Sequence, residues 1–247
     1  MVFSTTDYYI VATKDGYNPY TSPTISVEQE IVKWDFKMSP TTSGVTRLAG
    51  LTRVDTALAI AKASYSGTLA NVILATADNN PDALSVSSIA AQMQMPVLLV
   101  QKEGISDSVR QKIAAIKPAK VYIIGREGVI SPAVADQMTR LTGLAQTNIV
   151  RIGGADRYET SLAVTQYFNL AGQNVCVATG NNFPDALAGS VYAANHQAPI
   201  ILVDGSLTDQ AMNYLRTKKL SGATVFGGEA VVSQEIERQL GQLILNS

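Results

Sequence analysis

The sequence is poor in the residues that most often build metal sites and covalent catalysts. Its 247 residues include one cysteine, Cys176, and one histidine, His196. A single cysteine excludes an internal disulfide and any metal site made from several cysteines. A single histidine excludes motifs that bind a metal through two histidines, and it leaves histidine-based catalysis to one residue. We therefore predict no metal site.

The sequence also lacks an excess of either sign of charge and any long apolar run. The chain has 19 Lys and Arg against 20 Asp and Glu, a net charge of −1. This balance argues against a nucleic-acid-binding protein, whose domains are usually strongly basic. No window approaches the ~18 uninterrupted apolar residues of a transmembrane helix, so we expect no membrane partner either. The start, MVFSTTDYYIV, has no signal-peptide pattern, which predicts an intracellular protein or a piece of a secreted one.

What the sequence does contain is an internal repeat. Four blocks recur in the same order, and the offset between copies drifts only from 104 to 102 residues. Chance does not explain four ordered matches, so the chain is read as a leader followed by two homologous modules. The matched pairs are RLAGLTRVDT (47–56) with RIGGADRYET (151–160), ATADNNPDAL (75–84) with ATGNNFPDAL (178–187), MPVLLV (95–100) with APIILV (198–203), and IIGREGVIS (123–131) with VFGGEAVVS (225–233).

Each module alternates apolar strands with segments of helical spacing. In the second copy VCVAT (175–179) reads as a strand covered on both faces, and Pro184 opens the helix that follows. Residues 206–220 read as a further helix. Such alternation predicts parallel βαβ units. We therefore predict an α/β fold of two tandem, homologous three-layer modules with mainly parallel sheets, preceded by a short β segment.

The leader differs in character from the modules. The stretches at 8–14, 24–30 and 31–38 read as β-strands, and 15–23 as turn-rich. The leader is similar to the C-terminal part of carboxypeptidase-regulatory-like β-sandwich domains, through YYIVATKDGYNPYT and WDFKMSP. The predicted division is a partial β-sandwich and linker over 1–43, a first module over 44–150 and a second over 151–247.

The repeat also acts as a filter for functional residues, because a side chain that serves a shared task should occur in both copies. His196 aligns with Met93 and reads as a partly buried histidine at a helix end. Cys176 aligns with Ile73 and reads as a small hydrophobic residue within a strand. The turn RIGGADR does not supply the G-x-G-x-x-G of a dinucleotide site. No cofactor is predicted.

A small polar set passes the filter and lies at the predicted strand–helix junctions, where open α/β sheets bind ligands. Paired arginines there suit a carboxylate or phosphate. Alternatively, Arg157 could pair with Asp185 and merely tie two loops together. A lone aspartate in each motif, without a second carboxylate nearby, is a poor acid–base pair. The candidate ligand-binding residues are Arg47, Arg53, Thr56, Asn79 and Asp82, with Arg151, Arg157, Thr160, Asn182 and Asp185.

The four blocks together resemble the type-two cell-wall-binding repeat of Gram-positive surface proteins. The resemblance covers residues 47–247, with departures in the first copy at Ala49, Val54 and Arg126. It implies Toprim-like, Rossmann-like modules that attach a larger secreted protein to the wall without catalysis. The implied ligand is an anionic secondary wall polymer of the teichoic acid kind. Because relatives often carry three modules around a pseudo-threefold axis, the resemblance also implies a missing third module or a homo-oligomer.

Two other classes of function stay open. One is a protein–protein interaction module of a surface layer. The other is an enzyme, either a wall hydrolase or a Toprim-type nuclease. A Toprim-type site needs a D-x-D pair for metal ions, and residues 47–247 contain none. The expected location is the cell wall or cell surface.

Overall fold

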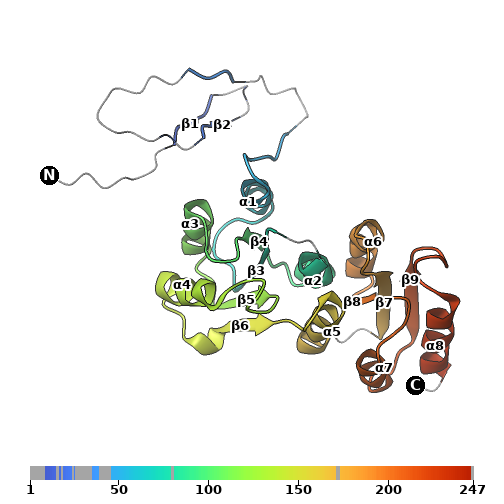
Figure 1. The fold of residues 1–247 in the computed structure, drawn as a ribbon. Coiled ribbons are helices and arrows are strands. Elements are labelled where there is room, and N and C mark those ends of the chain that lie inside the picture. Colours follow the sequence, from blue (N-terminus) through green and yellow to red (C-terminus); the bar gives the residue numbers. More distant parts are fainter. Residues whose placement is uncertain are drawn as a thin grey trace.

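The computed structural model describes residues 9–14, 17, 19–23, 25, 35–38, 46–78, 81–170 and 173–245. In these parts a short antiparallel ladder precedes two α/β units (Figure 1). The first unit runs through α1 (Arg53–Ser64), β3 (Asn71–Thr76), α2 (Pro81–Gln92), β4 (Val97–Val100), α3 (Asp107–Ile116), β5 (Lys120–Ile124) and α4 (Pro132–Thr142). After the 3-10 turn η1 (Gln146–Asn148) come β6 (Ile149–Ile152), α5 (Arg157–Phe168), β7 (Asn174–Thr179), α6 (Pro184–Asn195), β8 (Ile200–Val203), α7 (Asp209–Arg216), β9 (Gly222–Phe226) and α8 (Gln234–Leu245).

Both sheets are parallel and share one strand order. The first is β4-β3-β5-β6 and the second is β8-β7-β9, so β3, β4 and β5 correspond to β7, β8 and β9. The prediction of two homologous, mainly parallel α/β modules after a short β segment is confirmed. The fourth strand of the first sheet comes from the second copy of the repeat. Strand β6 spans the predicted boundary at 150/151 and pairs with β5, placing Val150 opposite Tyr122 and Arg151 opposite Ile123.

Helices cover the two faces of each sheet. In the first unit α1, α3 and α4 pack on one face. On the other face, α2 packs together with α5, which belongs to the second copy. Helix α5 also reaches the second core, because Leu162 packs there with Val175 and Ile201, while Val164 packs in the first unit. The two units therefore share α5, which contributes side chains to the cores of both.

Side chains cap the starts of α1 and α5 in two different ways. Thr52 and Asp55 make the complete capping box, in which each side chain accepts from the other's backbone N–H. In the second copy the Asp156 carboxylate accepts from the amides of Tyr158 and Glu159. The Glu159 carboxylate bonds to the amide of Ala155 instead of Asp156. Both caps satisfy N–H groups that a helix start leaves without partners.

The leader is only partly as predicted. Strand β1 (Val11–Ala12) lies in the stretch expected to be a strand, and it pairs with β2 (Tyr20–Thr21). The interpretation of 15–23 as turn-rich is wrong at β2, where the Tyr20 ring stacks on Phe36 at 4.6 Å. Residues 35–38 form no strand, and most of 24–34 lies outside the described residues.

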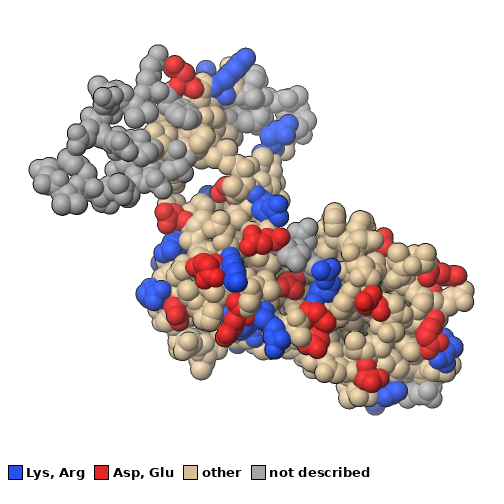
Figure 2. All heavy atoms as spheres, viewed as in Figure 1, with Lys and Arg blue, Asp and Glu red and all other residues tan. Residues whose placement is uncertain are grey.

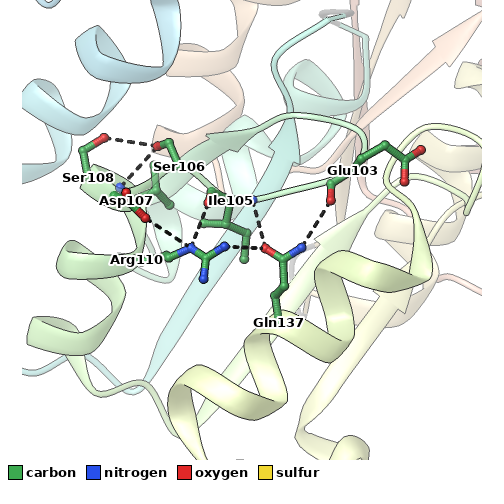
Figure 3. Close-up of polar contacts among 8 residues, drawn as sticks. Glu103, Ile105, Ser106, Asp107, Ser108, Arg110 and Gln137 are labelled. Atoms are coloured by element: carbon green, nitrogen blue, oxygen red, sulfur yellow. Dashed lines mark hydrogen bonds and ion pairs between the residues drawn. The ribbon is translucent and has the colours of Figure 1, made fainter. Parts of the chain in front are cut away.

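A polar cluster fixes the β4–α3 loop onto α4 (Figure 3). The Gln137 side chain on α4 accepts from the amide of Ile105 and donates to the carbonyl of Glu103. The Arg110 guanidinium donates to Gln137 and to the Ile105 carbonyl, and it lies 3.7 Å from Asp107. These contacts satisfy loop backbone groups, so we assign them a structural role.

Candidate functional site

A pocket of about 820 Å³ lies where the two copies of the repeat meet. Its walls are the start of α2, the β5–α4 loop, and the β6–α5 loop with the start of α5. Neither copy of the repeat forms it alone. The lining residues are Asp82, Arg126, Glu127, Gly128, Val129, Arg151, Gly153, Gly154, Ala155, Asp156, Arg157 and Thr160.

Four of the ten predicted site residues line this pocket: Asp82, Arg151, Arg157 and Thr160. The remaining predicted residues lie elsewhere. Asn79 lies outside the described residues. Three residues of the first copy lie just before α1 or in its first turn: Arg47, Arg53 and Thr56. Two residues of the second copy lie just before α6 or in its first turn: Asn182 and Asp185. This pocket therefore takes one predicted residue from the first copy and three from the second.

Arg151 holds the β5–α4 loop in place. It lies on β6, and its guanidinium donates to the carbonyls of Gly125 at 3.0 Å and Ile130 at 2.7 Å. A longer contact reaches Ser131. Burial lowers the pKa of the guanidinium, an effect that the nearby Glu127 opposes. Its counterpart Arg47 is exposed. Arg151 thus shapes the pocket wall and adds positive charge to it.

Arg157 anchors the end of a strand. Its Nη1 donates to the carbonyl of Gly180 at 2.6 Å, and in the first copy Arg53 donates to the Ala77 carbonyl at 2.9 Å. The guanidinium bonds to this carbonyl, and the described residues contain no ion pair between Arg157 and Asp185. The positive charge of Arg157 also acts to lower the pKa of Asp82, against the larger effect of burial.

The two threonines of the predicted set bond to the tight turn before their helix. The Thr160 hydroxyl accepts from the amide of Gly154 at 3.0 Å, and Thr56 accepts from Gly50 at the same distance. A β-carbon at Gly154 would lie 2.1 Å from the Glu159 β-carbon, and one at Gly50 would meet Asp55 as closely. This shared geometry explains why both copies keep glycine and threonine here.

Gly153 explains a departure between the copies. A β-carbon there would lie 2.8 Å from the carbonyl carbon of Gly125 and 2.9 Å from the Arg126 amide. The β5–α4 loop of the first copy therefore approaches Gly153 closely. The corresponding residue in the first copy is Ala49, which is exposed. Glycine is required where the loop of a preceding repeat packs against the turn.

Asp82 is the half-buried carboxyl of the pocket. It stands in the first turn of α2. Burial raises its pKa to about 6, although the Arg157 charge acts in the opposite direction. Glu127 and Asp156, neither of them among the predicted site residues, line the same pocket. The Asp156 carboxylate accepts hydrogen bonds from the amides at the start of α5.

Arg126 lines the pocket but is not among the site residues predicted from the sequence. It is exposed on the β5–α4 loop and lines the pocket. The repeat filter rejected it because the second copy has Gly228 at this position. The departure from the repeat could have indicated its role, because it places a charged side chain directly after Gly125. Gly125 has a φ of +112°, a conformation that favours glycine.

The single cysteine and histidine lie away from the pocket. Cys176 is buried in β7, and burial raises the pKa of its thiol to about 12. His196 is the C-terminal cap of α6 and stacks on Tyr192 at 3.8 Å. It is exposed and not partly buried as predicted. In the described part of the chain, no three His, Cys, Asp or Glu side chains group as a metal site.

Comparison with known proteins agrees with the architecture. A sequence model described as cell wall binding domain 2 (CWB2) matches residues 47–135 and 151–237. The chain belongs to this family. The CWB2 repeats thus coincide with the two copies found in the sequence, and the predicted resemblance is confirmed. Family membership makes the chain a cell-wall-binding protein located at the cell surface. Among the described helices, none is long and apolar enough to span a membrane.

Two curated relatives come from Bacillus subtilis (strain 168). N-acetylmuramoyl-L-alanine amidase LytC is 29% identical over 79% of this chain and 38% of its own length. The amidase enhancer is also 29% identical, over 78% of this chain and 26% of its own length. The chain therefore spans well under half of either protein.

Two solved structures share the CWB2 fold. Cwp6 from Clostridium difficile has a TM-score of 0.75 at 26% identity, covering 96% of this chain and 35% of that one. Cwp8 from the same organism has a TM-score of 0.71 at 29% identity, covering 81% and 34%.

Proposed function

We propose that the two CWB2 repeats bind an anionic secondary wall polymer of the teichoic acid kind and so attach a larger surface protein to the Gram-positive envelope. The observation that carries the proposal is the junction pocket with Arg126, Arg151 and Arg157 in its lining. A guanidinium offers a planar pair of donors to a phosphate or carboxylate group. Arg151 and Arg157 already donate hydrogen bonds to backbone carbonyls. Arg126 is therefore the arginine best placed to contact the ligand.

Non-catalytic attachment is the second part of the proposal. Asp82 and Glu127 line the same pocket, but three arginines line it too. A further carboxylate, that of Asp156, accepts hydrogen bonds from amides at the start of α5. Such a lining favours binding of a charged ligand group and disfavours acid–base catalysis on that group. The net charge of −1 gives little diffuse attraction to a polyanion, so recognition depends on these placed side chains.

Binding to purified envelopes tests the polymer as ligand. We expect the chain to sediment with intact Gram-positive envelopes and to lose most of this binding after acid extraction of the anionic polymers. Full binding to extracted envelopes would instead support a protein partner in the surface layer. Release of soluble wall fragments above a heat-inactivated control would contradict the non-catalytic part.

We also propose that a further repeat covers the outer face of α6, supplied by a longer polypeptide or by a second copy. Helix α5 of the second copy covers the equivalent face of α2 in the first copy, where Ile89 is 0% exposed. Its counterpart on α6, Tyr192, is 41% exposed. Figure 2 shows the surface over α6 to be largely uncharged, whereas Lys, Arg, Asp and Glu gather over the first unit and the junction.

Sedimentation velocity separates the two sources of that repeat. If a second copy supplies it, the chain should dimerise with rising concentration and Tyr192→Asp should abolish the dimer. A monomer at every concentration assigns the covering repeat to a longer polypeptide. A dimer that Tyr192→Asp leaves unchanged would contradict the role given to α6.

A further inference from the structure

We propose that the junction pocket binds its anion more tightly in mild acid than at neutral pH, because the carboxyl of Asp82 lines it together with three arginines. This regulation rests on the proposed function, since it concerns the same pocket. It requires that Asp82 lie inside the pocket, lack compensating hydrogen bonds, and be the carboxyl there that changes its charge.

The position of Asp82 meets the first requirement, and the contacts among the described residues meet the second. It belongs to α2, which packs against α5 across the junction, and its side chain lines the pocket. A β-carbon at Gly125 would lie 2.8 Å from Asp82 Oδ2, so the carboxylate rests against the backbone of the β5–α4 loop. Its side chain accepts no hydrogen bond from the residues that the structure describes. Burying a carboxylate without donors disfavours its charged form.

The other charged groups of the pocket come from three elements. The β5–α4 loop brings Arg126 and Glu127, and β6 brings Arg151. The start of α5 brings Asp156 and Arg157. The Asp156 carboxylate is held by two helix amides, and Glu127 is exposed to solvent. Neither shares the half-buried setting of Asp82. The only histidine of the sequence, His196, caps the C-terminal end of α6 and does not line the pocket.

The direction of the effect follows from linkage. Burial raises the pKa of Asp82 to about 6, so the carboxyl is mostly charged at pH 7.5 and mostly neutral at pH 5. The charged form repels an incoming anion. Protonation removes that repulsion, so affinity rises as the pH falls through about 6, and anion binding takes up a proton. Removing one negative charge from a partly exposed pocket is expected to change the affinity about tenfold.

The test is calorimetric titration of the full chain with sulfate, whose charge is constant over this range. We expect about tenfold tighter binding at about pH 5 than at about pH 7.5, with proton uptake. Asp82→Asn has nearly the same size but no charge, and it should bind tightly at both pH values. The matched control is Asp185→Asn, the equivalent residue on α6 outside the pocket, which should keep the wild-type pH dependence.

Each remaining outcome counts against the proposal. Equal affinity of the wild type at the two pH values would overturn it, as would an unchanged pH dependence in Asp82→Asn. Absence of sulfate binding at both pH values would remove the pocket as an anion site. Failure of the regulation alone is distinguishable from failure of the proposed function, because envelope binding at pH 7.5 would then persist and still be lost on acid extraction.

Discussion

Replacing Val164 with aspartate is expected to lower the free energy of unfolding by about 3–5 kcal/mol. Val164 lies on α5, is 0% exposed, and packs with Ile89 and Tyr122 across the junction. An aspartate there would be charged, buried and without a partner. For a chain of this length the melting temperature should fall by about 10 °C, measured by circular dichroism. Because α5 contributes to both cores, we expect one cooperative transition.

The matched control is Ile60→Asp. Ile60 holds the equivalent position on α1 in the first copy but is 48% exposed, since no preceding repeat covers it in this chain. A charge at that position stays in water, so the free energy of unfolding should change by less than about 0.5 kcal/mol. Equal destabilisation by the two substitutions would contradict the shared core at the junction.

The sequence predicted the elements well because their signals are local. Strands such as β3 and β7 are continuous apolar runs, and capping residues mark the starts of α1 and α5. The helix predicted over 206–220 was too long. Helix α7 ends at Arg216, because the chain must turn so that Leu220 enters the second core before β9 begins.

The junction was not predictable in the same way because it depends on pairing between distant segments. Nothing local in residues 149–152 indicates that β6 completes the sheet of the preceding copy. The repeat filter then selected residues common to both copies, whereas the pocket takes different residues from each. It kept Arg47, which the fold leaves exposed, and rejected Arg126, which lines the pocket.

Arg126 is the most informative position for testing function. Its exposed side chain lines the pocket and donates no hydrogen bond to the residues that the structure describes, so its loss should not affect folding. Arg140 on α4 provides the control, because it is also exposed and lies outside the pocket lining. Both alanine substitutions remove one exposed positive charge, but only the charge of Arg126 lines the pocket.

The decisive measurement is the affinity of Arg126→Ala and Arg140→Ala for purified envelopes at pH 7.5, with melting temperatures measured in parallel. A charged hydrogen bond to ligand contributes roughly 1.5–3 kcal/mol, so Arg126→Ala should bind about tenfold more weakly or worse. Its melting temperature should stay at the wild-type value, and Arg140→Ala should match the wild type in both measurements. Equal affinities for the two variants would contradict the assignment of the junction pocket as the wall-binding site.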